Sequence, residues 1–313
     1  MTAIQTEDLK KYFGKVHALD GLTLSVAEGT VFGFLGPNGA GKTTTFRLLT
    51  GLSKPTSGKA WVAGVEVKPG LKLAKHIGYL PEEPAFYTWM TPREFLDHVG
   101  RLFGFSAELR KKRVGELLEQ VGLAKVGKRR IGGFSKGMRQ RLGLAQAMFN
   151  QPEVLFLDEP VSALDPVGRK EILEMIETLR GKCTVFMSTH ILADVERICD
   201  SIGIIDQGKM LVEAPQDELT RKYTIPAFEI EVEPYGDKDL QNWTKILTQN
   251  EWVTSTKIEG DKIRITVNDI ETARMKLVSM LPESKLPIRK FEMVTPSLED
   301  VFMKVVHQQG GAQ

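Results

Sequence analysis

A glycine-rich segment of the chain has residue types and spacing suited to holding phosphate groups. It reads Gly36-Pro-Asn-Gly-Ala-Gly41-Lys42-Thr43 and lies between an apolar run, Val31–Leu35, and a run with helical spacing, Thr44–Thr50. Glycines let such a loop curl so that successive backbone N–H groups point at one spot, where the following helix adds its positive end. In this context the pattern G-x-x-x-x-G-K-[ST] predicts a nucleoside triphosphate site, against the alternative of a ligand-free turn.

The residues of this phosphate loop (residues 36–43) have distinct expected roles. We expect Lys42 to place its charge on the β- and γ-phosphates, as a catalytic group, and the Thr43 hydroxyl to bind Mg²⁺. The residues expected to bind the nucleotide are Gly36, Pro37, Asn38, Gly39, Ala40, Gly41, Lys42, Thr43 and Thr44.

Two adjacent carboxylates supply the other half of such a site. They end the segment Val154-Leu-Phe-Leu-Asp158-Glu159, whose four apolar residues predict a strand buried on both faces. Ligands of α/β sheets bind at the carboxyl ends of strands. We expect Asp158 to hold Mg²⁺ through water and Glu159 to polarise the water that attacks the γ-phosphate. An ordinary turn at the end of a strand is the alternative.

The elements that must position these residues indicate an α/β domain. Up to about residue 220, short β-branched runs alternate with amphipathic stretches, which predicts an α/β core with a mostly parallel sheet. Residues 84–150 have helical spacing without a clear strand, over Thr91–Phe103 and Ala107–Val121, and predict an inserted helical subdomain. The runs that predict buried strands are Val31–Leu35, Val154–Asp158, Thr184–Ser188 and Ile202–Asp206.

After Pro226 the pattern changes to strand, helix, two strands, helix and strand, which is typical of a small α+β domain of the split βαβ kind. Its expected elements are Phe228–Val232, Leu240–Gln249, Val253–Ile258, Lys262–Val267, Glu271–Leu281 and Ile288–Met293. Ser297-Leu-Glu-Asp300 then predicts the capped start of a last helix. The chain is therefore expected to consist of a domain of residues 1–220 and an accessory domain of residues 225–313.

The composition disfavours several classes of protein. Lys and Arg total 42 against 40 Asp and Glu, a net charge of +2, which is too balanced for a general nucleic-acid binder. The longest uncharged stretch, Gly29–Gly41, is rich in glycine and well short of the ~20 apolar residues of a membrane helix. Residues 1–11 lack the apolar core of a secretory signal. Cys183 and Cys199 are expected to be buried in a reducing cytosol.

Several ordered motifs over residues 4–220 resemble the ATP-binding cassette family, the nucleotide-binding subunits of ABC transporters. The most discriminating is Phe134-Ser-Lys-Gly-Met-Arg-Gln-Arg141, which is similar to the family's signature loop, usually L-S-G-G-Q. The resemblance implies that Ser135 and Gly137, with Lys136 and Met138 beside them, face the γ-phosphate of ATP bound by the opposite subunit. Lys136 replaces a glycine and its role stays open. An ordinary helix capped by Ser135 is the alternative.

The same resemblance assigns two residues farther along the chain. Ser162-Ala-Leu-Asp165 is similar to the family's D-loop, which implies that Asp165 lies at a dimer interface. Asp165 followed by Pro166 is also typical of a helix N-cap, and the two roles are compatible. His190 follows an expected strand and resembles the switch histidine that contacts the γ-phosphate.

Two further assignments concern the base and the metal. Phe13, before Gly14, resembles the aromatic residue that stacks on adenine, with Tyr12 as the second candidate and a core aromatic as the alternative for each. Glu82 takes the place of the family's glutamine after Pro81, where its carboxylate could bind Mg²⁺. At ~4 Å and an effective dielectric of ~20, one charge pair is worth about 4 kcal/mol, so Mg²⁺ must lie close if Glu82 faces the phosphates. A solvent-facing Glu82 is the alternative.

The segment after Glu83 is unusually aromatic, with Phe86, Tyr87, Trp89 and Met90. In the family this region receives the membrane subunit, and exposed aromatic and Met side chains suit the core of an interface. Burial inside the helical subdomain is an equal alternative.

Taken with the resemblance, these features predict the ATPase subunit of an ABC transporter, with ATP and Mg²⁺ as ligands. The family pattern implies a homodimer that sandwiches ATP and drives a separate multi-helix permease from the cytoplasmic face of the cell membrane. Lys136, Glu82 and the tail Ser297–Phe302 resemble the daunorubicin-resistance and sodium-exporter type, which implies export. The accessory domain is expected to be regulatory or to support the dimer.

Two other functions remain open on the sequence. One is a soluble ABC ATPase acting on ribosomes or nucleic acid, although the chain has no second phosphate-loop motif and no room for a long coiled coil between Lys42 and Ser135. The other is a nucleotide-binding module without turnover, which the carboxylate Glu159 disfavours. No nucleic-acid partner is expected.

Overall fold

The computed structural model of the chain describes residues 1–68, 71–162, 164–223, 226–233, 237–284 and 286–294, with residues 298, 302 and 305 beyond them. The chain forms two compact units, Met1–Gln216 and Asp217–Gln313, called here the N-terminal and C-terminal units. The domain boundary expected near residue 220 falls inside helix α8 (Gln216–Tyr223). The expected fold class is confirmed, because a mostly parallel sheet with helices is followed by a small α+β unit.

A six-stranded sheet forms the centre of the N-terminal unit, in the order β10-β9-β3-β8-β7-β6. Its strands are β3 (Val31–Leu35), β6 (Ile77–Leu80), β7 (Val154–Asp158), β8 (Thr184–Ser188), β9 (Ser201–Asp206) and β10 (Lys209–Pro215). All neighbours are parallel except β10, which is antiparallel to β9. Every residue of β3, β7 and β8 is buried, as their continuous apolar runs predict.

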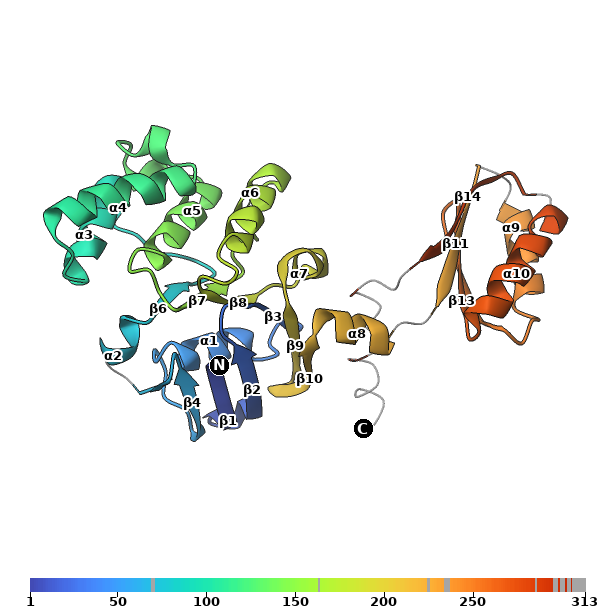
Figure 1. The fold of residues 1–313 in the computed structure, drawn as a ribbon, viewed down its shortest axis with the longest axis horizontal. Helices are drawn as coiled ribbons and strands as arrows, with labels where there is room; N and C mark the ends of the chain where they lie inside the picture. The colour runs from blue at the N-terminus through green and yellow to red at the C-terminus, as the bar shows by residue number, and fades with distance from the viewer. Residues whose placement is uncertain are drawn as a thin grey trace. The chain divides into compact units, whose positions relative to one another are not determined.

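A second, antiparallel sheet was not expected from the sequence. It has the order β2-β1-β4-β5 and consists of β1 (Thr2–Phe13), β2 (Val16–Ala27), β4 (Ser57–Val62) and β5 (Val65–Glu66). Register shifts along β1 and β2, with Asp8 at a φ of 45°, interrupt the alternation of apolar and polar residues that identifies a strand. One apolar core joins the two sheets through Phe46 and Leu49 of helix α1 (Lys42–Leu49), which lies between them in Figure 1.

The expected helical subdomain is present. Residues 81–153, all of which the structure describes, contain helices and no strand. Figure 1 shows α3, α4 and α5 gathered to one side of the central sheet. The remaining helical elements of the N-terminal unit are α2 (Leu71–Ala74), α3 (Pro92–Leu102), α4 (Ala107–Gln120), η1 (Ala124–Val126), η2 (Ile131–Gly133), α5 (Lys136–Ala147), α6 (Pro166–Glu177) and α7 (Leu192–Ile198).

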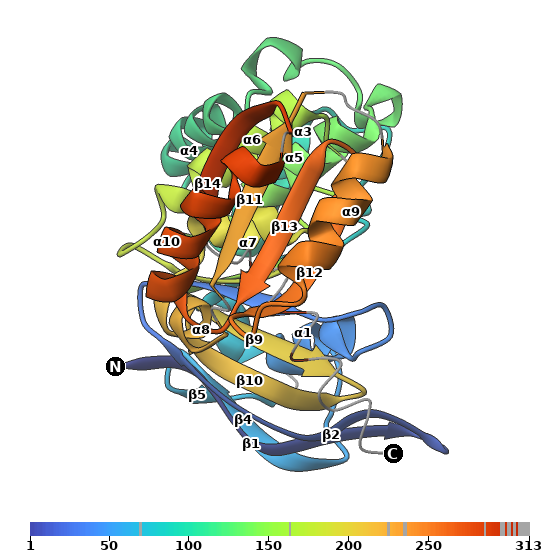
Figure 2. The same ribbon diagram turned by 90° about the vertical axis from the view of Figure 1, so that its right-hand side faces the viewer.

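The C-terminal unit has the expected βαββαβ order and an antiparallel sheet ordered β12-β13-β11-β14. Its elements are β11 (Ala227–Val232), α9 (Asp237–Leu247), β12 (Val253–Glu259), β13 (Lys262–Val267), α10 (Ile270–Met280), η3 (Pro282–Ser284) and β14 (Ile288–Val294). Figures 1 and 2 show α9 and α10 on one face of this sheet. There Phe228, Ile230, Trp243 and Leu277 form part of a separate core. The expected helix start at Ser297 lies outside the described residues.

Both cysteines are buried and unpaired, as expected, since neither Cys183 nor Cys199 forms a disulfide. Among the helices that the structure describes, none is long and apolar enough to cross a membrane.

Candidate active site

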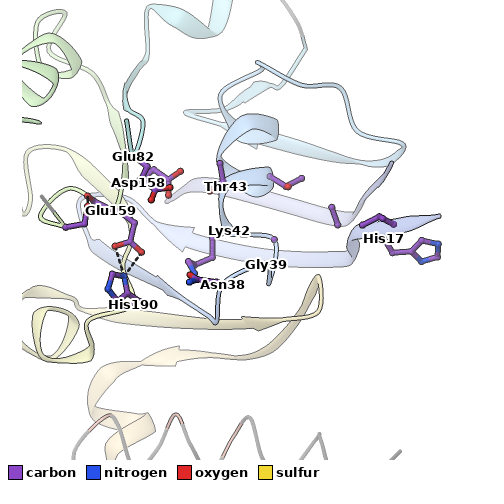
Figure 3. Close-up of a pocket in the computed structure, with 14 residues that line it drawn as sticks. His17, Asn38, Gly39, Lys42, Thr43, Glu82, Asp158, Glu159 and His190 are labelled. Atoms are coloured by element: carbon purple, nitrogen blue, oxygen red, sulfur yellow. Dashed lines mark hydrogen bonds and ion pairs between the residues drawn. The ribbon is translucent and has the colours of Figure 1, made fainter. Parts of the chain in front are cut away.

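A cavity of about 660 Å³ in the N-terminal unit brings the phosphate loop and the paired carboxylates together (Figure 3). This main cavity lies where β3 and β7 end, the place at which α/β sheets bind ligands. Its lining residues are Val16, His17, Ala18, Asn38, Gly39, Gly41, Lys42, Thr43, Thr44, Glu82, Asp158, Glu159, Ser162 and His190.

The phosphate loop has a backbone conformation that only glycine fits well. Gly41 precedes α1 with a φ of 109°, and a Cβ atom there would lie 2.5 Å from the carbonyl oxygen of Ala18. No side chain caps the start of α1, so its first N–H groups remain available to an anion. Lys42 Nζ donates to the carbonyl oxygens of Gly36 at 2.6 Å and Pro37 at 3.1 Å. The lysine is therefore held across the loop that would receive the phosphates.

Asp158 ends β7 and is only 1% exposed. Its Oδ1 accepts a hydrogen bond from Ser188 Oγ at 2.5 Å, because the parallel pairing of β7 and β8 places these two residues side by side. Its Oδ2 is buried and no described residue hydrogen-bonds to it. A buried carboxylate oxygen without a partner is costly. Together with the Thr43 hydroxyl in the same cavity, this oxygen fits a hydrated Mg²⁺, whose preferred ligands are oxygen atoms.

Glu159 and His190 form a close pair at the edge of the main cavity (Figure 3). His190 Nδ1 lies 3.1 Å from Oε1 and 3.0 Å from Oε2 of Glu159, so a proton on Nδ1 is donated to the carboxylate. The Glu159 side chain is 10% exposed and the His190 side chain 58%. The pair thus joins a buried carboxylate to a side chain that solvent reaches.

The charged groups in the main cavity shift one another's pKa values. Burial raises the pKa of Glu159 above its ordinary value, opposed by the hydrogen bond and charge of His190 and by Lys42. Burial lowers the pKa of Lys42, opposed by Glu159, Asp158 and Glu82. A carboxylate whose pKa is raised in this way is better matched to accepting a proton near neutral pH.

The backbone of Glu159 has a left-handed conformation, with a φ of 51°. Its N–H is 3.1 Å from Ser188 Oγ and 3.2 Å from the Ser188 carbonyl oxygen. Its carbonyl oxygen accepts from Gln140 Nε2 at 3.3 Å and Ser162 Oγ at 3.1 Å. Sequence reasoning did not single out Gln140 or Ser188. The available signal for Gln140 was its place, with Leu144 and Ala147, on the buried stripe of α5.

Two family models match most of the chain between them. One, described as ABC transporter, matches residues 19–162, and the other, described as ATP-binding protein DrrA1-3-like, C-terminal domain, matches residues 215–306. The uncharacterized ABC transporter ATP-binding protein YxlF of Bacillus subtilis is 41% identical, over 97% of this chain and 99% of YxlF. The bacitracin transport ATP-binding protein BcrA of Bacillus licheniformis is 38% identical, over 97% of each chain.

The chain belongs to the ATP-binding subunits of ABC transporters. It is accordingly an ATP-hydrolysing subunit of this family, and these relatives give no support to the ribosomal alternative.

Solved structures of the family cover about 70% of this ABC ATPase. The ATP-binding subunit of an ABC transporter has a TM-score of 0.66 at 30% identity, over 71% of this chain and 93% of that one. The dimeric ATP-binding cassette MJ0796, in a post-hydrolysis state bound to ADP and Pi, has a TM-score of 0.62 at 25% identity, over 68% and 98%.

The signature loop of the ABC ATPase does not reach the main cavity of its own chain. None of Ser135, Lys136, Gly137 and Met138 is among the lining residues. Ser135 Oγ accepts from the N–H of Met138 at 3.2 Å, which confirms the expected N-cap of α5. Lys136 instead lines a second cavity of about 450 Å³, together with Glu82, Glu83, Pro84, Arg139, Gln140 and Ser162.

Asp165 accepts a hydrogen bond from the N–H of Gly168 at 2.9 Å, which confirms its N-cap role at the start of α6. Its interface role stays a prediction. Glu82 is exposed but lines both cavities, so its position is compatible with both of its expected roles.

The aromatic residues expected to hold adenine do not line the main cavity. Phe13 ends β1, is 56% exposed, and carries Lys11 Nζ 4.9 Å from its ring centre. The Tyr12 hydroxyl donates to Asp20 at 2.8 Å and its ring stacks on His17 at 4.0 Å. His17, which sequence reasoning missed, does line the cavity, although its ring points away from the other labelled side chains in Figure 3. Phe13 is exposed and Tyr12 half-buried, and the adenine-stacking role of either ring stays a prediction.

Proposed function

We propose that this ABC ATPase binds ATP with Mg²⁺, closes as a homodimer, and powers export of a small molecule through a separate membrane permease. The observation that carries the hydrolytic part is the Glu159–His190 pair beside the phosphate loop. The export direction is supported by the match of the C-terminal unit to the DrrA1-3-like family and by the name of the bacitracin transport relative.

The residues of the main cavity divide the chemistry among them. The α1 amides and Lys42 bind the phosphates, while Glu159 accepts a proton from the attacking water. His190 orients the Glu159 carboxylate and contacts the γ-phosphate. Asp158 and Thr43, with Glu82 as a further ligand, hold Mg²⁺, which neutralises charge on the phosphates. Phe13 stacks on the adenine base.

A homodimer is supported by the incompleteness of the main cavity. The signature residues Ser135 and Gly137 are not among its lining residues, so the role proposed for them at the γ-phosphate requires a second subunit. One dimeric cassette bound to ADP and Pi is similar to this chain over 68% of its length. In this arrangement Asp165, exposed at the start of α6, lies at the interface.

Contact with a permease is supported by an exposed aromatic cluster in the helical subdomain. Trp89 is 62% exposed and its ring lies 5.8 Å from that of Tyr87, which is also exposed. Phe86 behind them is partly buried against Phe95 at 5.1 Å. Amphipathic aromatic rings suit the core of a protein interface. Through this contact the ATPase is held at the cytoplasmic face of the cell membrane.

The C-terminal unit is proposed to regulate the ATPase or to support the dimer. The core residues described for this unit all belong to the unit itself, so it packs around a core of its own.

Substitution Glu159→Gln tests the proposed chemistry. The variant should bind ATP with unchanged affinity but release phosphate about 10²–10⁴-fold more slowly, since it lacks the general base. Light scattering should then show an ATP-dependent dimer that persists. Glu177→Gln, on an exposed face of α6, is the matched control and should behave as wild type. Near-normal turnover by Glu159→Gln would transfer the role to another residue, with His190 the first to test.

A further inference from the structure

We propose that Gln140 is a positioning residue, which holds the backbone of Glu159 and so ties the signature helix α5 to the catalytic base of the same subunit. This inference rests on the proposed role of Glu159 as the general base. Gln140 is not itself among the residues that line the main cavity. It acts through the carbonyl group of Glu159.

The contact is buried and joins helix α5 to the residue that follows strand β7. Gln140 is 3% exposed, and its Nε2 donates to the carbonyl oxygen of Glu159 at 3.3 Å. Gln140 lies in α5 and Glu159 directly follows β7, the next element along the chain. A buried amide without this acceptor would lose a hydrogen bond that water cannot replace. The contact therefore constrains both partners.

Glu159 needs such a constraint because its backbone conformation is unfavourable. A φ of 51° is uncommon for a residue with a side chain and persists when surrounding contacts hold it. Ser188 fixes the N–H side of the residue, while Gln140 and Ser162 fix its carbonyl side. Rotation of either peptide group would turn the carboxylate away from His190, which it meets at 3.0 and 3.1 Å. The carbonyl contacts thus set the direction of the base.

The consequence is a direct link between the signature loop and hydrolysis. Ser135 caps α5, and Gln140 follows five residues later, about 7.5 Å along a helix that rises about 1.5 Å per residue. A helix is stiff over this distance. When the signature loop engages the nucleotide of the opposite subunit, a shift of α5 moves the donor that holds Glu159. Occupancy of one site is therefore conveyed to the base of the other.

The test uses the full-length chain and the substitution Gln140→Met, which keeps the length and apolar volume of the side chain but removes the donor. We expect kcat to fall about fivefold to a hundredfold, since a lost hydrogen bond and a displaced reacting group both slow the chemical step. KM and the Kd of a slowly hydrolysed ATP analogue should stay within about twofold.

Gln146→Met is the matched control, since Gln146 is a half-buried glutamine on the same helix. It should leave kcat, KM and the Kd of the analogue unchanged. Unchanged kcat in a folded Gln140→Met variant would overturn the proposal. So would a loss of nucleotide affinity that matches the loss of kcat, because this is the result of a merely structural role.

A second variant keeps the test decisive if Gln140→Met does not fold. Ser162→Ala removes the other side-chain donor to the Glu159 carbonyl, from an exposed position that the core does not need. It should lower kcat, because only the backbone N–H of Ser162, 3.4 Å from the carbonyl oxygen, then remains as a donor from this residue. Wild-type kcat in Ser162→Ala would contradict the proposal. Glu159→Gln, assayed in parallel, separates a failure here from a failure of Glu159 as the base.

Discussion

At the scale of the residue, the environment of Glu159 sets the pH at which it works. Burial raises its pKa, and the largest opposing influence is the hydrogen bond with His190. The base accepts a proton only when ionised, so kcat should fall as the pH drops through a pKa that lies above the ordinary value of Glu. A profile of kcat against pH under saturating ATP measures this value.

The substitution His190→Gln tests the direction in which His190 shifts the pKa of Glu159. Gln retains a hydrogen-bond donor but removes the positive charge, so the pKa of Glu159 rises further and the acid side of the profile moves to higher pH. His76→Gln is the matched control, because His76 pairs with the exposed Glu153 at 2.6 Å, remote from the main cavity. A profile that moves to lower pH in His190→Gln would contradict the assignment.

At the scale of the element, strand β6 and helix α5 approach each other at a glycine. A Cβ atom on Gly78 would lie 1.9 Å from the carbonyl oxygen of Ala147, the last residue of α5. Because that oxygen belongs to the backbone, the helix itself would have to shift. Gly78→Ala should destabilise the protein by about 1–3 kcal/mol or more, measured as a lower midpoint of thermal unfolding.

The control substitution is expected to raise the stability of the protein rather than lower it. Gly115 lies in α4 with no atom within 4 Å of an added Cβ, so Gly115→Ala should raise stability by about 0.5–1 kcal/mol through the better helix propensity of alanine. Equal midpoints for the two variants would show that the β6–α5 contact can relax. In that case the close approach would not hold α5 in place.

At the scale of the whole molecule, the residues of the nucleotide site lie in the N-terminal unit, while the accessory role is proposed for the C-terminal unit. All residues that line the main cavity precede residue 217, and the C-terminal unit has its own core. A chain lacking residues 225–313 should therefore keep its affinity for ATP while its ATPase rate or ATP-dependent association changes. Equilibrium nucleotide binding, phosphate release and light scattering measure the three quantities.

Substitution Ile230→Ala in the full chain complements the truncation. Ile230 is fully buried in the core of the C-terminal unit, so its loss should destabilise that unit by about 2–5 kcal/mol and leave nucleotide binding intact. A truncated chain with unchanged rate and unchanged association would remove both proposed roles of the C-terminal unit.

The sequence by itself determined the contiguous parts of this protein. Residues 36–43 identify the phosphate loop because their backbone amides converge through local chain geometry alone. The strand ending at Asp158 is recognisable because a strand buried on both faces must be apolar throughout. The pattern of residues after Pro226 likewise predicted the βαββαβ order of the C-terminal unit.

Only the tertiary structure decided which distant residues meet. The pairing of Glu159 with His190, the contact of Gln140 with the Glu159 carbonyl and the exclusion of the signature loop from the main cavity depend on how separate elements pack. The bulged strands β1 and β2 also escaped prediction, since their alternation is interrupted. Hydrogen bonds between residues far apart in the chain leave no local pattern, because their partners are set by the packing of the whole unit.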